Sequence, residues 1–229
     1  KSLYLPDGIT GLGYYAFYNC SALESMDLSR SELPTIQEDT FSQCSKLSEV
    51  QLPETLTRIE YEAFRSCSAL TEIQLPDTLQ TIEYSAFQYC SALKSVDLPD
   101  SVTSMGNYVF HGCSALESVK LPAGLTTIPY GIFYYCTSLQ GITIPDTVTA
   151  IESSAFYGCS SLHKITIPRT VATISTSAFG YDAAPGESMD LTICGEYNSA
   201  AYEYAEANGF GFELSAERDY SQCVVGYYI

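Results

Sequence analysis

Seven of the nine cysteines recur at a nearly constant spacing, so the thiol is the first group in this sequence to examine for chemistry. They are Cys20, Cys44, Cys67, Cys90, Cys113, Cys136 and Cys159. Thiols can hold zinc, form disulfides or act as nucleophiles. No C-x-x-C pair occurs, and His111 and His163 stand at different positions relative to the cysteines. The spacing of a zinc site is therefore missing, and we expect no metal.

Disulfides between successive cysteines are also disfavoured. Thiols stacked one repeat apart would have parallel Cβ vectors, and seven of them cannot all pair. We therefore expect a structural ladder of free, inward-facing thiols, in which cysteine acts as a small buried hydrophobic residue. Cys194 and Cys223 lie outside this ladder. A disulfide between these two is an open alternative.

Carboxylates and amides form a second periodic set, eight and ten positions after each recurring Phe. The candidates for a binding face are Asp27, Glu49, Gln51, Glu72, Gln74 and Asp97. Glu49 and Glu72 would lie about one strand spacing apart, a separation reminiscent of retaining glycosidases. A regular solenoid offers no closed cleft, so a solvated acidic patch is the favoured interpretation. A weak Ca²⁺ site from Asp27 and Glu49 is a second alternative.

Tyrosine provides a third signal, because the chain has 19 tyrosines and no tryptophan. Tyrosine offers a large rigid contact area and a hydroxyl group, which suits the recognition of proteins or sugars. The candidates on this side are Tyr61, Tyr84, Tyr130, Tyr134 and Tyr157. The competing interpretation is that tyrosines in register shield the coil beneath them and bind nothing.

A strict sequence repeat positions all of these residues. Phenylalanine occurs at 17, 41, 64, 87, 110, 133, 156 and 179, so that successive positions are 24 apart once and 23 apart six times. An aliphatic residue or Met stands five before each Phe, and Leu stands six after nearly all of them. The pattern predicts a repeat solenoid, a leucine-rich repeat right-handed superhelix that is rich in β-structure.

Each repeat should form two short parallel strands and a tight turn. Leu70–Leu75 ends in an apolar–polar alternation that is typical of a strand with one buried face. Pro76 ends that strand because it cannot donate a hydrogen bond, and Leu79–Ile82 predicts a second extended run on another side. The segment "EYSAFQYC" is too short for a stable helix, so we expect a 3₁₀-like turn.

The repeat pattern ends after Phe179. The segment "GYDAAPGESMDLTICG" lacks the Cys three positions and the Leu six positions after the Phe and reaches its strand about three positions late. A capping helix is predicted next, with Asn198 or Ser199 as N-cap and Gly209 at its end. We expect three parts: about eight repeats over 1–179, a degenerate last repeat with the capping helix over 180–214, and a tail over 215–229. The tail is either a strand or the start of a missing neighbour.

Composition limits the partners. The chain has 229 residues and a formal net charge of -17, so nucleic acid and anionic membrane surfaces would be repelled. No stretch approaches the length of a membrane-spanning apolar run, and we expect no direct membrane insertion of this segment. Residues 5–28 already belong to a repeat, so the chain is expected to be a piece of a longer protein. No G-x-S-x-G, Walker, H-E-x-x-H or EF-hand spacing appears, and neither catalysis nor a cofactor is expected.

The phrase A-F-x-x-C-x-x-L-x-x-I-x-L-P at this period, together with "LTICGEYNSAAYEYAEANGF", resembles the BspA-type leucine-rich repeats of bacterial cell-surface proteins. The resemblance covers about residues 3–214. It implies an extracellular or cell-surface module for protein binding and adhesion, in some members directed at host matrix proteins. The alternatives are a carbohydrate-binding module that uses exposed tyrosines and a passive spacer between other domains.

Overall fold

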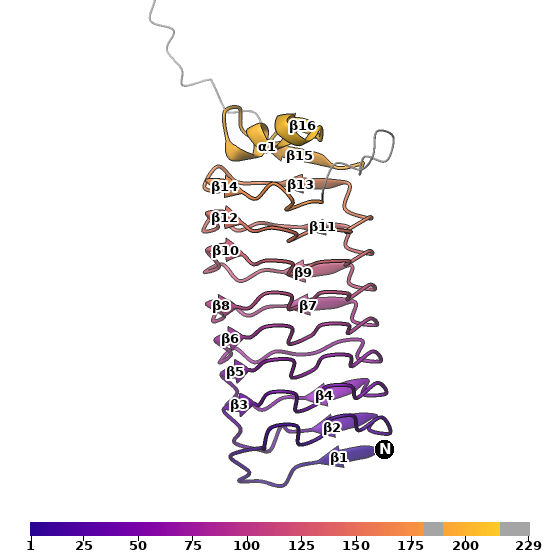
Figure 1. The fold of residues 1–229 in the computed structure, drawn as a ribbon. Helices are drawn as coiled ribbons and strands as arrows, with labels where there is room; N and C mark the ends of the chain where they lie inside the picture. Colours follow the sequence, from indigo (N-terminus) through magenta and orange to yellow (C-terminus); the bar gives the residue numbers. More distant parts are fainter. Residues whose placement is uncertain (181–189, 216–229) are drawn as a thin grey trace, which may run out of the picture.

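The protein is a rod of stacked coils in the computed structural model, which describes residues 1–180 and 190–215 (Figure 1). Most coils carry short strands on two of their sides, and all strand pairings between coils in the described residues are parallel. The regular register pairs positions 23 apart, such as Ser95 with Ser118. This confirms the prediction of a repeat solenoid.

The first side, called here the strand face, carries the strands that follow each Leu. They are β1 (Ser2–Tyr4), β2 (Ser25–Asp27), β4 (Glu49–Gln51), β7 (Ser95–Asp97), β9 (Ser118–Lys120), β11 (Gly141–Ile142), β13 (Lys164–Thr166), β15 (Thr192–Gly195) and β16 (Gly211–Leu214). They form three sheets, in the orders β1-β2-β4, β7-β9-β11 and β13-β15-β16. An isolated bridge between Thr143 and Thr166 continues the pairing from β11 to β13.

The second side carries the shorter strands that precede each Phe. They are β3 (Thr35–Ile36), β5 (Arg58–Ile59), β6 (Thr81–Ile82), β8 (Ser104–Met105), β10 (Thr127–Ile128), β12 (Ala150–Ile151) and β14 (Thr173–Ile174). Between the two sides the Pro carbonyl begins a turn: Pro76 O accepts from Leu79 N–H at 3.0 Å. The predicted second extended run is therefore present.

Phenylalanine rings form a continuous column through the rod. Successive rings from Phe17 to Phe179 are stacked, with centroids 5.1–5.9 Å apart and interplanar angles of at most 22°. The rings from Phe41 to Phe179 are fully buried. Each added coil thus buries the apolar face of the coil before it, which is why a single coil would not fold alone.

The turn around each Phe has the predicted hydrogen-bond spacing but not the backbone of a 3₁₀ helix. Ala86 N–H donates to Glu83 O, and Cys90 N–H donates to Phe87 O. Ser85 and Tyr89, however, have φ values of 55° and 60°. A right-handed helix cannot pass through such residues, so the segment is a series of separate turns with left-handed residues between them.

The last coil is longer than the others, and a helix covers it. Lys164 pairs with Thr192, an offset of 28 where the regular offset is 23, so the strand arrives five positions late and not three. Helix α1 (Ala200–Asn208) has Ser199 as its N-cap, whose Oγ accepts from Tyr202 N–H, and Gly209 closes it with a φ of 73°. The predicted capping helix is confirmed, with Ser199 in place of the alternative Asn198.

Helix α1 seals the end of the phenylalanine column. Tyr204 packs edge-on against Phe179 at 5.7 Å, and its hydroxyl donates to Thr176 O at 3.2 Å. Strand β16 then adds one more parallel partner to β15. Residues 181–189 and nearly all of the predicted tail 215–229 lie outside the described residues, so those boundaries stay predictions. Among the helices described, none has the length and apolar character needed to cross a membrane.

Candidate functional site

The strand face presents the predicted polar side chains to solvent. In β4 the central Val50 is buried, while Glu49 and Gln51 on either side are exposed. The same alternation holds for β7, β9 and β13. Side chains alternate across a strand, so the residues eight and ten positions after each Phe face outward as expected.

The strand face is interrupted at one coil. Residues 71–76 form no strand, and they separate the sheet that ends at β4 from the sheet that begins at β7. Within the described residues, one backbone hydrogen bond ties this segment to a neighbouring coil, from Lys94 N–H to Thr71 O at 3.1 Å. The sequence did not predict this gap, because residues 70–75 follow the same pattern as their paired counterparts.

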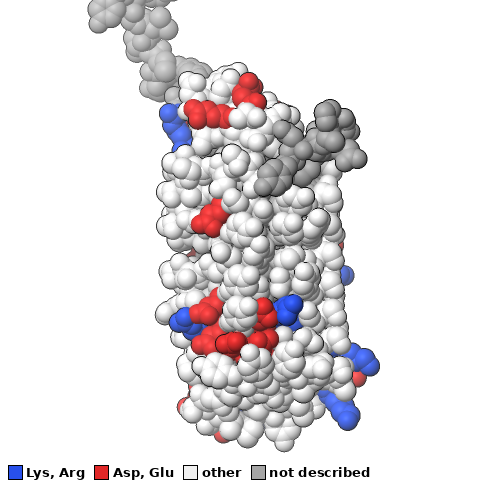
Figure 2. Space-filling view, in the orientation of Figure 1, with Lys and Arg blue, Asp and Glu red and all other residues white. Residues whose placement is uncertain are grey.

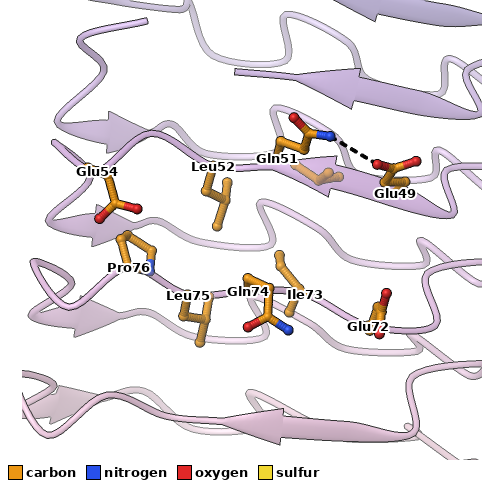
Figure 3. A pocket seen from close by; sticks show the side chains of 10 residues that line it. Glu49, Gln51, Leu52, Glu54, Glu72, Ile73, Gln74, Leu75 and Pro76 are labelled. Atoms are coloured by element: carbon orange, nitrogen blue, oxygen red, sulfur yellow. Dashed lines mark hydrogen bonds between the residues drawn. The ribbon is translucent and has the colours of Figure 1, made fainter. Parts of the chain in front are cut away.

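A groove of about 260 Å³ lies at this interruption, which we call the strand-face groove (Figure 3). It is lined by Glu49, Val50, Gln51, Leu52, Glu54, Glu72, Ile73, Gln74, Leu75 and Pro76. Equivalent residues of two consecutive coils therefore face the same space. Four of the six predicted strand-face candidates, Glu49, Gln51, Glu72 and Gln74, come together here.

The strand-face groove combines an acidic rim with apolar side chains. Figure 3 shows Leu52 and Leu75 between the acidic residues, with Glu54 toward one end and Glu49 and Glu72 toward the other. Gln51 Nε2 donates to Glu49 Oε1 at 3.1 Å, which orients that carboxylate. The groove can therefore accept cationic groups and apolar side chains together.

The other two strand-face candidates, Asp27 and Asp97, do not line the groove. Asp27 Oδ1 accepts from the backbone N–H of Ser29 at 2.9 Å and from its hydroxyl at 2.6 Å. These hydrogen bonds lower the pKa of Asp27. Asp97 pairs in register with Lys120 on the next strand. Neither carboxylate joins a larger acidic group within the part of the chain that the structure describes.

The metal and glycosidase alternatives find no assembled site. Nowhere in residues 1–180 and 190–215 do three His, Cys, Asp or Glu side chains gather as they would around a metal ion. Oδ1 of Asp27 already accepts two hydrogen bonds from Ser29. Glu49 and Glu72 are both exposed on an open groove and not enclosed by a cleft.

The cysteine ladder is internal, and each buried thiol has a hydrogen-bond partner. Six members, from Cys44 to Cys159, are fully buried. The Sγ of each donates to the carbonyl oxygen of a Phe in the preceding coil at 3.1–3.2 Å, as Cys90 does to Phe64 O. Burial raises the pKa of Cys44 to about 11 and those of Cys90 and Cys159 to about 12. These thiols are structural and poorly suited to nucleophilic chemistry.

Cys20 departs from the prediction, because it is exposed. It belongs to the first of the Phe-centred coils, where Phe17 is also only half-buried. A ladder position is buried only when a coil packs on each side of it. Cys194 is buried and free within the described residues, and Cys223 lies outside them, so the proposed disulfide between the two stays a prediction.

Tyrosines from four coils line a second pocket, of about 530 Å³, which we call the tyrosine pocket. Its lining residues are Tyr84, Gln88, Tyr108, His111, Tyr130, Tyr134, Ser154 and Tyr157. Four of the five predicted tyrosines are among them. The fifth, Tyr61, stacks on Tyr84 with ring centroids 5.2 Å apart but does not line the pocket.

Tyr108 stands at the centre of this cluster. Its ring is edge-on to Tyr84, Tyr130 and Tyr134, at centroid distances of 5.7, 5.0 and 6.4 Å. Burial, followed by its hydrogen bond to Tyr130, raises the pKa of Tyr108. Sequence reasoning missed this residue because it stands two positions before its Phe, while the other tyrosines of the pocket stand three before or one after. A search for aromatic residues at every repeat position would have found it.

His111 is part of the aromatic cluster around Tyr108. Its ring lies 5.4 Å from that of Tyr108 and 5.0 Å from that of Tyr134. Gln88 Nε2 lies 2.7 Å from its Nδ1. Burial lowers the pKa of His111, so the imidazole is neutral at pH 7.

Charge is unevenly distributed over the rod. Figure 2 shows acidic side chains gathered over a few coils in its lower half and wide uncharged areas elsewhere on the same face. Ion pairs in the coils of β5 and β6 join Arg58 to Glu60 and Glu83, and Arg65 to Glu62. The lining of the tyrosine pocket includes no Asp, Glu, Lys or Arg.

Solved structures of leucine-rich repeat proteins are similar to this chain. One from T. pallidum is 32% identical, with a TM-score of 0.64, over 70% of this chain and 77% of that chain. One from Bacteroides ovatus is 25% identical, with a TM-score of 0.75, over 92% of this chain but only 59% of the other. A leucine-rich cell surface protein from Faecalibacterium prausnitzii is 25% identical, with a TM-score of 0.50, over 90% of this chain and 69% of that one. No curated protein matches.

The family assignment rests on the repeats themselves. The model of the BspA type leucine rich repeat region, which comprises six copies, matches residues 1–94 and 57–184. These matches include every coil with a regular period and both pockets described above. The predicted resemblance is thereby confirmed, and the chain belongs to the family of BspA type leucine-rich repeat proteins.

Proposed function

We propose that this chain is a non-catalytic, bacterial, cell-surface or secreted module that binds a protein partner through its strand face and so mediates adhesion. Leucine-rich repeat proteins generally serve as protein-interaction modules. The observation that carries the proposal for this chain is the strand-face groove, where strand pairing between the sheets of β4 and β7 is interrupted and four outward-facing candidates converge.

The chemistry of the groove selects a class of partner. Glu49, Glu54 and Glu72 give it three carboxylates, and Leu52 and Leu75 give it apolar contacts. The whole chain carries a net charge of -17, which steers basic surfaces toward it. We infer that the partner presents Lys or Arg side chains beside an apolar residue, because charge complementarity sets specificity and an apolar centre supplies affinity.

The proposed location rests on similarity. The Faecalibacterium prausnitzii protein is described as a cell surface protein, and it is similar over 90% of this chain. Host matrix proteins and other surface proteins are the partners to test first, since an exposed module on a bacterium would meet both.

The test is surface plasmon resonance of purified host matrix proteins over the immobilised chain. The variant Glu49→Ser/Gln51→Thr/Glu72→Ser/Gln74→Thr uses residues that other coils carry at the same repeat positions, such as Ser95 and Thr143. The fold should therefore tolerate it. We expect the dissociation constant of a bound matrix protein to rise at least tenfold and the wild-type affinity to fall with added salt.

The matched control removes charge elsewhere, as Asp146→Asn/Glu206→Gln, and should bind like the wild type. A matrix protein that binds the fourfold variant as tightly as the wild type would exclude the strand-face groove as its site. Absence of binding by the wild type to every matrix protein would contradict adhesion to the host matrix.

A further inference from the structure

We propose that the tyrosine pocket is a second binding site, separate from the strand-face groove, and that it takes an uncharged saccharide unit of a glycan. The two sites share no residue. This inference therefore does not depend on the protein-binding function proposed above. It rests on the shape of the pocket, its aromatic walls, its neutral polar groups and the way the sequence builds it.

The pocket has the size and the surfaces that a sugar ring requires. Its volume of about 530 Å³ lies within the roughly 300–1,000 Å³ typical of small-ligand sites. Tyr108, Tyr130, Tyr134 and Tyr157 are all half-buried, so each ring is held by neighbours while part of it stays accessible. Tyr134 and Tyr157 lie nearly parallel, with centroids 4.8 Å apart and an interplanar angle of 9°. This stacking fixes both rings, and the part of each ring that stays accessible can pack against the C–H face of a pyranose.

The polar groups of the pocket are neutral and able to bond hydroxyls. Gln88 is close enough to donate from Nε2 to Nδ1 of His111, at 2.7 Å, and the imidazole then carries its proton on Nε2 as a donor. The tyrosine hydroxyls can both donate and accept. Because no lining side chain is charged at pH 7, the pocket offers nothing to balance an ionic ligand, whereas the hydroxyls of a sugar match it.

The sequence builds this pocket with a pair of residues in adjacent coils. Two positions before their Phe, several other coils carry a serine, namely Ser85, Ser154 and Ser177, where this coil carries Tyr108. The next coil has Gly131 at the same position, with a φ of 59°. A Cβ at Gly131 would lie 2.5 Å from Cε1 of Tyr108, so only glycine lets that ring lie against the next coil.

A second tyrosine at this repeat position lies outside the pocket. Tyr15 also stands two positions before its Phe, but the coil that follows it carries Asp39 in place of glycine. Tyr15 is 51% exposed, whereas Tyr108 is half-buried among other rings. Tyr108, with Gly131 beside its ring, stands at the centre of the tyrosine cluster, and Tyr15 provides a control of the same residue type at the same repeat position.

A glycan array probed with the full chain tests the proposal. We expect neutral glycans to bind. We expect Tyr108→Ser and Tyr134→Gln each to raise the dissociation constant of the bound glycan at least tenfold, as measured by calorimetry. Both replacements occur at the same repeat position in other coils, as Ser85 and Gln88, so the fold should persist. Circular dichroism and the melting temperature check this. The control Tyr15→Ser makes the same change at the same repeat position outside the pocket and should leave binding unchanged.

Three results would overturn the proposal. The first is an array without any neutral glycan above background. The second is a glycan that the pocket variants bind as well as the wild type. The third is that the chain binds proline-rich peptides, tested in parallel, and binds no glycan. Aromatic grooves also bind such peptides, which makes them the competing class of ligand. The fourfold strand-face variant should keep its glycan affinity, so failure of one proposal is distinguishable from failure of the other.

Discussion

Cysteine suits its position in the repeat because it meets two requirements at once. The carbonyl of Phe64 accepts from the backbone N–H of Cys67 in its own coil and from the Sγ of Cys90 in the next. Alanine would fill less of the core and would donate nothing. Serine would donate a stronger hydrogen bond but would bury a more polar and smaller group. The ladder is thus a set of links between coils and not a store of reactive thiols.

Thiol labelling should separate the end of the ladder from its interior. At pH 8, we expect an alkylating reagent to modify Cys20 rapidly and the members from Cys44 to Cys159 slowly, because burial raises their pKa values and blocks access. Mass spectrometry of peptides assigns each modified site. Labelling in denaturant is the control and should reach all of them at similar rates. Fast labelling of Cys90 in the native protein would contradict a closed core.

The sequence predicted the cysteine ladder but not the exposure of Cys20. A repeat pattern indicates which side chains point inward, but it does not show whether a neighbouring coil covers them. The same limit applies to Tyr108. Tyr108 matters because its ring contacts residues one coil away. A comparison of one repeat position at a time does not reveal such contacts.

At the scale of the element, the turns around each Phe have a backbone conformation that the intrinsic preferences of their residues do not predict. Within residues 1–180 and 190–215, twelve residues other than glycine have positive φ, and eleven of them stand two positions before or after a Phe. Each costs of the order of 1–3 kcal/mol in isolation, so stacking against the neighbouring coils must hold them in place. Short, polar-rich turns can be predicted from sequence, but a conformation imposed by neighbours cannot.

The capping helix has a start signal that mutation can test. Replacing Ser199 by Ala removes the Oγ that accepts from Tyr202 N–H, and we expect the free energy of unfolding to fall by about 1 kcal/mol. Amide hydrogen exchange should accelerate in α1 and β16 before the central coils change. Ser21→Ala, at an exposed serine in the first Phe-centred coil, is the control. Equal exchange in both variants would show that the cap contributes nothing.

At the scale of the molecule, the period was predictable and the positions of the two pockets were not. Residues 70–75 carry the same apolar pattern as the segments that become β7 and β9, yet they form no strand. Whether the strands of two adjacent coils form hydrogen bonds depends on the spacing of those coils, which is a property of the whole stack. Four strand-face candidates nevertheless line one groove and four predicted tyrosines line one pocket, because a strict period brings equivalent positions together.

Removal of one whole coil should abolish one proposed site and leave the other intact. Deletion of residues 57–79 takes out one full period and joins Leu56 to Gln80, which is equivalent to Thr57. We expect the solenoid to refold with β4 next to β7, the strand-face groove to vanish and the tyrosine pocket to persist. Circular dichroism, the melting temperature and the two binding assays measure this.

The control deletion, of residues 57–75, falls four positions short of a full period and breaks the register. We expect it to lose the cooperative melting transition, because every later side chain would be displaced along the coil. If both deletions melt alike, the coils are not interchangeable units, and the stack depends on contacts that the repeat does not describe.

The sparse hydrogen bonding of residues 71–76 to their neighbours has a mechanical consequence. Under the proposed attachment to a partner, tension along the rod acts on every interface between coils, and the interface with the fewest hydrogen bonds yields first. Stretching should therefore open the rod first between β4 and β7. Each coil that unfolds would release roughly 80 Å of extended chain, which lengthens the rod and lowers the force on the attachment before the attachment breaks.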